Sequence, residues 1–317
     1  MKKTYILLTA AAALTLGACT HKPHFEVDMP QDATPGKYSA PEGQGFLGNE
    51  LTWEDVADVQ STISNLKFTV TGPNGVKEVH EFNNPAEASE WMIPLPAGDY
   101  DVLVTANMDA DNGFELSETP PTKAGLTIPD TYAWLSDPSS NPDQVWNGIG
   151  HVRVENDKMA TAHVDLDRLL AVFTLKFTHV PEGATIDVSM RGAAHYVTLT
   201  KEYATGHWGE PSAEISDDIV LGKITASNAL TLIDEFKVLP TAKGQMGTIL
   251  LFHIKTDKGL EQEYMGQAPL MENGKTYILE LDYTKLTPYM FITAGGSIND
   301  WTETWIYGGE ILNPETE

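Results

Sequence analysis

The stretch NLKFTVTGPNGVKEVHEF, residues 65–82, decides the fold class. In its first half the apolar residues Leu66, Phe68 and Val70 alternate with polar neighbours, which is the period of a half-buried β-strand. The Pro-Asn-Gly sequence at 73–75 favours a tight turn, and the segment then returns with a similar pattern. The stretch therefore predicts a β-hairpin.

The same period of two recurs along most of the chain. In LPAGDYDVLV, residues 95–104, a Pro-Ala-Gly turn delivers Tyr100, Val102 and Val104 to one face of a strand. Further strands are predicted at 150–155, 161–166, 171–178, 185–190, 195–200, 235–239, 248–256, 260–265, 275–283 and 289–293. No ten-residue segment beyond the N-terminal run has a convincing helical period, so the predicted class is mainly β.

Composition narrows the function classes. The chain has 317 residues, 45 Asp and Glu against 20 Lys and Arg, and 41% hydrophobic residues, which indicates an acidic globular protein. The net charge of -25 repels phosphate backbones, and the three arginines, Arg153, Arg168 and Arg191, form no patch, so nucleic-acid binding is excluded. The one cysteine, Cys19, excludes an intrachain disulfide and a multi-cysteine metal site.

The N-terminus has the pattern of an export signal. Two lysines precede an apolar run at residues 5–16, which is too short to cross about 30 Å of hydrocarbon. The run ends in Leu16, Gly17, Ala18 and Cys19. Residues 1–18 are therefore predicted to be a signal peptide that is cleaved after Ala18.

These four residues resemble a bacterial lipobox. The resemblance implies that Cys19 carries diacylglycerol and a fatty acyl chain such as palmitate, and that it becomes the N-terminus of the mature lipoprotein. Several acyl chains would hold the protein permanently on a membrane, and Thr20 in place of Asp implies the outer membrane. The alternative is an ordinary secreted protein in which Cys19 is a stray thiol.

Residues 19–50 are rich in proline and glycine and poor in apolar residues, which predicts a flexible tether. Within it, residues 43–48 match the dinucleotide pattern GxGxxG letter for letter. No apolar strand precedes the match and no βαβ unit follows it, so we interpret it as linker.

Two pairs of segments look like weak internal copies. A Phe-Thr strand runs into a Pro-x-Gly turn at 68–75 and again at 177–183, and Gly-x-Tyr at 98–100 compares with Gly-x-x-Tyr at 274–277. These pairs predict two tandem Greek-key β-sandwiches, at 51–165 and 166–317, the second with a C-terminal tail.

Several motifs in order along the chain are similar to one family. They are the lipobox, the proline-rich tether, LPAGDYDVLV at 95–104, VDLDRLLAVFTLKF at 164–177, GKTYILELDY at 274–283 and SINDW at 297–301. Together they resemble the fimbrillin superfamily of Bacteroidales surface lipoproteins, which supplies stalk, tip and anchor subunits of type V pili. The resemblance implies two transthyretin-like β-sandwiches, no enzymatic activity, and other fimbrial subunits as partners in cell adhesion.

The resemblance also bears on the kind of subunit. Stalk subunits lose their first strand to an arginine-specific protease, and a neighbour's C-terminal strand then fills the groove. Here the first arginine is Arg153, which implies an anchor or accessory subunit that keeps its first strand; cleavage at Lys37 or Lys67 would reverse this. Such a subunit would offer residues 301–312 as donor, with a free tail from Gly308, unless residues 301–307 close the second sandwich.

One loop has the spacing of a calcium site. Oxygen-bearing side chains occur at positions one, three, five, nine and twelve of residues 107–118, namely Asn107, Asp109, Asp111, Glu115 and Glu118. Asn112 stands where the sharp-turn glycine belongs, so an Asx-rich turn is the preferred interpretation and calcium a side hypothesis.

Other chemistry has little support in the sequence. The nine histidines show no metal-binding pair and no G-x-S-x-G motif occurs, so no catalytic residue is predicted, although a carboxylate pair is not excluded by counting. The seven tryptophans keep a surface glycan-binding lipoprotein open as the alternative function, with a host protein or glycan as its ligand.

Overall fold

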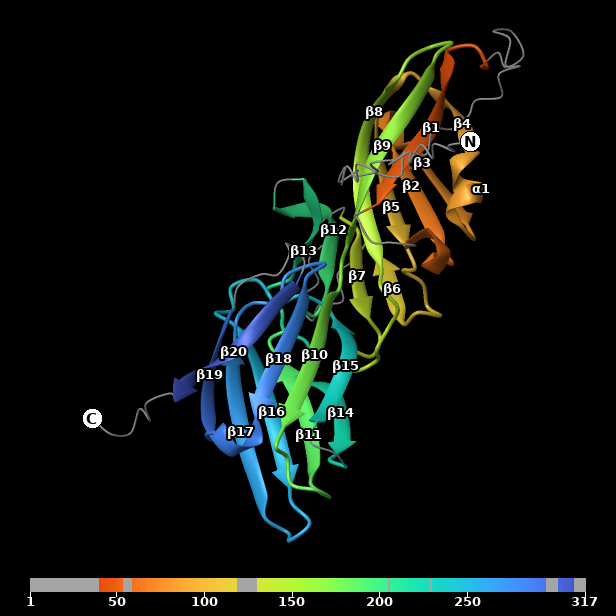
Figure 1. Ribbon diagram of the computed structural model, residues 1–317. Helices are drawn as coiled ribbons and strands as arrows, with labels where there is room; N and C mark the ends of the chain where they lie inside the picture. The colour runs from red at the N-terminus through yellow and green to blue at the C-terminus, as the bar shows by residue number, and fades with distance from the viewer. Residues whose placement is uncertain are drawn as a thin grey trace, which may run out of the picture.

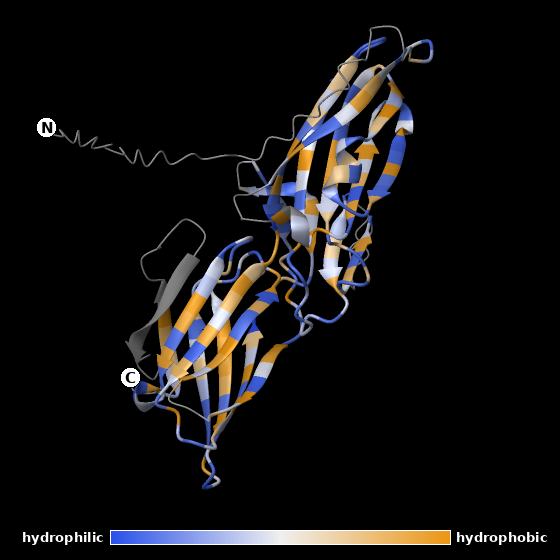
Figure 2. Cartoon of the chain, turned by 45° about the vertical axis from the view of Figure 1, so that its right-hand side comes forward, coloured by the Kyte–Doolittle hydropathy of each residue, from blue (hydrophilic) through white to orange (hydrophobic). Residues whose placement is uncertain are grey.

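The computed structural model describes residues 40–53, 59–118, 130–204, 206–227, 230–294 and 302–310, the last range as backbone (Figure 1). Strands make up 59% and helices 6%, which confirms the predicted mainly β class. The helical segments are α1 (Pro85–Ser89), η1 (Val59–Thr62), η2 (Pro73–Gly75) and η3 (Tyr283–Lys285). Hydrophobic and hydrophilic residues alternate along the strands (Figure 2), as in sheets that bury one face.

The first sheet has the strand order β3-β2-β5-β8-β9-β1-β4. Its strands are β1 (Gln44–Trp53), β2 (Leu66–Thr71), β3 (Lys77–Phe82), β4 (Met92–Pro96), β5 (Gly98–Ala106), β8 (Trp146–Val154) and β9 (Met159–Arg168). β8 and β9 pair only where Trp146 faces Arg168 and Asn147 faces Asp167, and we call this short contact the corner of the sheet. Six of the seven strands contribute to one buried cluster, against which Phe82 of β3 packs, and we call this unit the first sandwich.

The hairpin predicted at residues 65–82 is confirmed as β2 and β3. Leu66 pairs with Phe82, and the inward side chains of Leu66, Phe68 and Val70 are completely buried. At the turn Asn74 has φ 59°, a left-handed conformation that asparagine tolerates better than most residues. The sequence pattern and the turn chemistry thus fix the same register.

The tether predicted for residues 19–50 ends earlier than expected. Residues 44–53 form β1, which pairs with β9 on one side and β4 on the other. The residues at its inward positions include Gly45 and Asn49, so the alternation of apolar and polar residues that marks a strand is not visible in the sequence. A Cβ at Gly45 would lie 2.1 Å from the carbonyl oxygen of Glu155, and Asn49 Nδ2 donates to the Ala88 carbonyl at 2.9 Å. The GxGxxG letters therefore belong to a strand and its leading turn.

The second sheet has the order β14-β11-β16-β17-β19-β20-β18-β10-β15. Its strands are β10 (Ala171–Thr178), β11 (Thr185–Arg191), β14 (Ile219–Thr225), β15 (Leu230–Val238), β16 (Thr248–Lys255), β17 (Glu261–Ala268), β18 (Thr276–Asp282), β19 (Tyr289–Ala294) and β20 (Thr302–Glu310). The sheet curls until its edges meet: a Cβ at Gly222 of β14 would lie 3.6 Å from Ile233 Cδ1 of β15. It encloses the largest core, and we call it the second sandwich.

Seven strands repeat between the two sandwiches. The pairings β3-β2, β2-β5, β5-β8, β9-β1 and β1-β4 have the same partners and directions as β14-β11, β11-β16, β16-β17, β18-β10 and β10-β15. β19 and β20 have no counterpart in the first sandwich and are an addition to the second. The segments that suggested a repeat in the sequence are not equivalent, because residues 68–71 lie in β2 whereas Phe177 lies in β10. The transthyretin-like topology itself stays a prediction.

A third, four-stranded sheet joins the two sandwiches. Its order is β13-β12-β7-β6, with β6 (Phe114–Ser117), β7 (Tyr132–Leu135), β12 (Val197–Ala204) and β13 (His207–Pro211). Val197 pairs with Ala133 and Thr198 with Tyr132, so strands from both halves share it at the waist of the molecule (Figure 1). The domain boundary predicted between residues 165 and 166 falls inside β9, because this strand continues to Arg168.

Candidate functional site

The predicted lipid site lies outside the described residues. Leu16, Gly17, Ala18 and Cys19 all precede residue 40, where the description begins. Within the described part of the chain, no helix has the length and apolar character needed to cross a membrane. Lipid attachment at Cys19 stays a prediction from the sequence.

The predicted calcium loop is braced by its own hydrogen bonds. Asn107 is 3% exposed, and its Oδ1 accepts from the Ser64 backbone N–H at 2.9 Å. Its Nδ2 donates to the carbonyls of Thr62 and Gln144, at 3.0 and 3.2 Å. This side chain therefore fastens three segments together, and its oxygen is already in use.

The other candidate ligands of this loop point to different partners. Asp109 Oδ1 accepts from the backbone N–H of Asn112, three residues further on, at 3.0 Å, so this carboxylate closes the loop on itself. Glu115 Oε1 accepts from Ser136 Oγ at 2.8 Å, and Glu118 pairs with Lys77. Among the described residues no group of three or more His, Cys, Asp or Glu is placed to hold a metal. Calcium binding here, with Asp111 as a further ligand, stays a prediction.

The tryptophans do not assemble into a sugar-binding platform where they are described. Trp53, Trp91 and Trp146 lie in the core of the first sandwich, and the Trp53 and Trp146 rings meet edge to face with centroids 6.0 Å apart. Trp134 and Trp208 are half-buried, and the side chains of Trp301 and Trp305 lie outside the described residues. The glycan-binding alternative is therefore not favoured.

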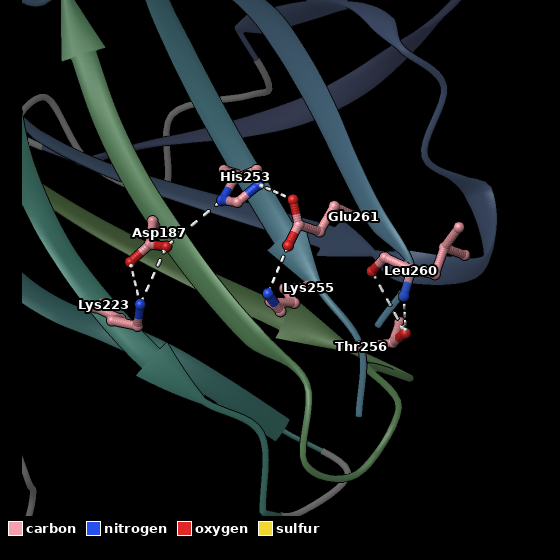
Figure 3. Close-up of polar contacts among 7 residues, drawn as sticks. All are labelled: Asp187, Lys223, His253, Lys255, Thr256, Leu260 and Glu261. Carbon is pink, nitrogen blue, oxygen red and sulfur yellow. Dashed lines mark hydrogen bonds and ion pairs between the residues drawn. The ribbon is translucent and has the colours of Figure 1, made fainter. Parts of the chain in front are cut away.

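The outer face of the second sandwich carries a ladder of charged side chains (Figure 3). Asp187 Oδ1 lies 3.1 Å from Lys223 Nζ, and Asp187 Oδ2 lies 3.6 Å from His253 Nδ1. His253 Nε2 lies 3.8 Å from Glu261, whose pKa is lowered by its hydrogen bond from Lys255. All five side chains are well exposed, so the ladder is a solvated sheet face rather than a catalytic arrangement.

The first and last described strands are each paired with one parallel and one antiparallel neighbour, but they belong to different parts of the fold. β1 is held between β9, which runs parallel to it, and β4, and its inward Leu47, Leu51 and Trp53 belong to the first core. β20 lies between β18, which runs parallel to it, and β19. Removing β1 would open the first sandwich, whereas removing β20 would take away part of the addition to the second.

The C-terminal strand extends further than the sequence suggested. Met290 pairs with Glu310 and Phe291 with Gly309, so β20 runs through the residues predicted to form a free tail. The alternative prediction, in which residues 301–307 close the second sandwich, agrees with the pairing of Thr276 with Thr302 and Glu280 with Ile306. Pairing with β19 alone carries the strand beyond Tyr307 to Glu310.

The solved structures that match this chain include an adhesin and two fimbrial proteins. A candidate adhesin from Bacteroides thetaiotaomicron is 12% identical, with 70% of this chain and 79% of that one covered and a TM-score of 0.48. The fimbrial anchor protein Mfa2 from Porphyromonas gingivalis is 13% identical, with 84% and 98% covered and a TM-score of 0.45. The tip fimbrial protein Mfa3 from the same organism is 10% identical, with 83% and 99% covered and a TM-score of 0.34.

The family is shown by sequence. The comparison with curated proteins gave no match. A sequence model of the fimbrillin-A associated anchor proteins Mfa1 and Mfa2 matches residues 59–307, which is well over half of the chain. The predicted resemblance to fimbrillins is confirmed, and the chain belongs to the family of fimbrillin-A associated anchor proteins.

Proposed function

We propose that this protein is a lipid-anchored fimbrial subunit of the anchor or accessory kind, which links to a neighbouring subunit by offering its C-terminal strand β20. The observation that carries the proposal is the repeated strand order. The seven strands that complete the first sandwich are all present in the second without β19 and β20. A strand that is not among the seven that the two sandwiches share is suited to pair with another chain.

Backbone pairing makes the exchange physically reasonable. β20 is bonded to β18 by the register from Thr276 with Thr302 to Glu280 with Ile306. A neighbour's open groove would offer β20 the same backbone donors and acceptors, so hydrogen bonds are exchanged rather than lost. The cost of the exchange is then the loss of packing in the second sandwich.

The first strand supports an anchor rather than a stalk role. No arginine precedes Arg153 in the sequence, so an arginine-specific protease has no site before or within β1. With β1 in place the first sandwich has no empty groove, and the subunit donates a strand without accepting one. Cleavage at Lys37 or Lys67 would change this assignment.

Anchoring rests on the lipobox. Diacylglycerol and fatty acyl chains on Cys19 would place the protein on the outer membrane at the cell surface, with other fimbrial subunits as partners. In the variant Cys19→Ala we expect release of the protein from washed membranes. A variant that still pellets completely with outer membranes after a high-salt wash contradicts the lipid anchor.

Truncation tests the donor strand. A chain ending at Trp301 lacks β20, and we expect it to stay folded and membrane-bound while fimbriae are shed into the medium. The matched control ends at Glu310, keeps β20, and should retain its fimbriae. Fimbriae that stay attached to cells carrying the folded Trp301 truncation remove the donor role.

A disulfide lock tests the same strand without deleting it. Ile278 and Thr304 face each other across β18 and β20, so Ile278→Cys with Thr304→Cys should tie β20 to its own sheet. We expect fimbriae to be shed when the bond is formed and to remain attached when a reductant is present. Attachment that is unaffected by complete bond formation, measured by mass spectrometry, contradicts strand exchange.

A further inference from the structure

A cavity of about 210 Å³ opens at the waist, where the hairpin β6–β7 meets segments of the second half. Its floor is apolar, with the buried side chains of Leu135, Ile219 and Leu239. Its rim carries Trp134 and polar groups from both halves. The volume is below that of typical drug-sized sites and suits a single long side chain.

One wall holds a carboxylate beside an indole ring. Glu115 of β6 and Trp134 of β7 are direct partners across the two strands, so their side chains project from the same face. Ser136, two residues after Trp134, donates from Oγ to Glu115 Oε1 at 2.8 Å. This hydrogen bond fixes the carboxylate next to the half-buried Trp134.

The second half of the chain supplies another carboxylate, Asp217, to the cavity lining. The Ser216 backbone N–H donates to the Ala193 carbonyl at 3.0 Å, and Ser216 Oγ donates to the Asp217 carbonyl at 3.0 Å, which pins the segment. The Asp217 carboxylate has no ion pair within the described part of the chain, and no Lys or Arg lines the cavity. The site therefore combines an indole ring, an apolar floor, two carboxylates and the imidazole of His195, without a Lys or Arg.

We propose that the waist cavity binds a lysine or arginine side chain of a partner polypeptide. The methylene stem would lie on the apolar floor and against Trp134, and the cationic head would lie near Glu115 and Asp217. A second copy of this chain is a poor occupant, because two chains of net charge -25 repel each other. The proposal does not depend on strand donation, so the two can fail separately.

The test uses the full-length lipoprotein in detergent, labelled with 5-fluorotryptophan, with the Trp134 resonance assigned through Trp134→Phe. Acetyl-lysine methylamide and acetyl-arginine methylamide should shift this resonance saturably, with dissociation constants on the order of 1 to 10 mM. Acetyl-norleucine methylamide, which has the lysine stem without the charge, should not. Glu115→Gln with Asp217→Asn should weaken binding about tenfold or more, and added salt should weaken it further.

Three outcomes overturn the proposal. They are no saturable shift with either cation, an equal shift with the norleucine compound, and a shift with N-acetylglucosamine but not with the cations. A fourth contradiction would be unchanged affinity in the double variant, provided that its unfolding midpoint matches that of the wild type. Lys223→Gln lies away from the cavity lining and serves as the control for nonspecific charge effects.

Discussion

The two sandwiches differ at one corner. In the first, β8 and β9 come so close that a Cβ at Gly148 would lie 2.0 Å from the carbonyl oxygen of Asp165. In the second, the corresponding strands β17 and β18 are separated by β19 and β20. The same seven strands thus close directly in one case and around an inserted hairpin in the other.

The difference shows where the fold has room for change. Glycine at 148 and 150 lets two backbones approach, and this approach seals the first core without another strand. At the second corner, Gly266 of β17 faces the side chain of Ile292 on β19, with Ile292 Cδ1 2.8 Å from a Cβ at that position. A side chain can move aside more easily than a backbone, so the second corner should be the more adaptable one.

Replacing the glycine at each corner by alanine should give the largest change in the free energy of unfolding. For Gly148→Ala we expect a loss of about 3 kcal/mol or more in the free energy of unfolding, because the new Cβ collides with backbone. For Gly266→Ala we expect about 1 to 2 kcal/mol, because Ile292 can change its rotamer. Urea unfolding of each variant measures both values.

Gly48→Ala in β1 is the matched control for this pair. Its Cβ would meet the nearest atom, the Trp91 carbonyl oxygen, at 3.7 Å, which is an ordinary contact. Its cost should stay within about 1 kcal/mol. Equal losses for Gly148→Ala and Gly266→Ala would show that the two corners are equally rigid.

The next largest difference in stability should come from the loops that follow the equivalent strands β5 and β16. The side chain of Asn107, after β5, holds Thr62, Ser64 and Gln144, whereas the side chain of Thr256, after β16, bonds to nearby Leu260 (Figure 3). Asn107→Ala should cost about 2 to 4 kcal/mol, because it leaves three part-buried backbone groups without their partner, and Thr256→Ala should cost within about 0.5 kcal/mol.

Asn107→Gly separates two causes of the expected loss. Asn107 has φ 58°, so glycine relieves backbone strain while it still removes the side-chain hydrogen bonds. If Asn107→Gly is as stable as the wild type, the bracing role is wrong. Thermal unfolding of the same proteins with and without millimolar calcium also tests the calcium prediction for residues 107–118.

Much of this fold could be predicted from the sequence, and the predictions that failed did so for physical reasons. The hairpin at residues 65–82 was predictable because apolar alternation and turn chemistry agree there. β1 was not, because close backbone approach selects Gly45 and a buried amide selects Asn49 at inward positions. A period of hydrophobic residues cannot reveal a strand whose inward side is partly glycine and amide.

The candidate site was less predictable than the fold. The sequence indicated the C-terminal strand through its apolar residues, but the position of β20 between β18 and β19 depends on pairings with distant strands. The waist cavity joins Glu115 and Trp134 to Asp217, which is about a hundred residues away in the sequence. The spacing of residues 107–118 placed Glu115 in a calcium loop, and in the structure its carboxylate accepts a hydrogen bond from Ser136.

Hydrogen exchange should distinguish the two terminal strands. Amides in β1 should exchange only on opening of the first sandwich, because β1 carries core side chains and is paired on both sides. Amides in β20 should exchange through a smaller opening, with a free energy lower by about 2 kcal/mol, if β20 can leave its sheet. Equal protection of both strands in the native protein would argue against β20 as a detachable strand.

The smallest effect should come from two carboxylates near the ends of equivalent strands, Asp167 in β9 and Asp282 in β18. Burial raises the pKa of Asp167, although His207 Nδ1 lies 2.9 Å from its Oδ2. The hydroxyl of Thr284, followed by its backbone N–H, lowers the pKa of Asp282 well below the usual range.

These opposite pKa shifts predict opposite dependences of stability on pH. For Asp167 the folded state binds the proton more tightly, so stability is greatest below an unfolded pKa of about 4 and falls as pH rises through the raised pKa. For Asp282 the contribution is present above about pH 4 and is lost as pH falls towards the lowered pKa. As pH rises from about 2.5 to 6, Asp167→Asn should therefore gain stability relative to the wild type, chiefly above about pH 4, and Asp282→Asn should lose it, chiefly below about pH 4. Urea midpoints measured across this range check the signs, and slopes of the same sign for both variants would contradict them.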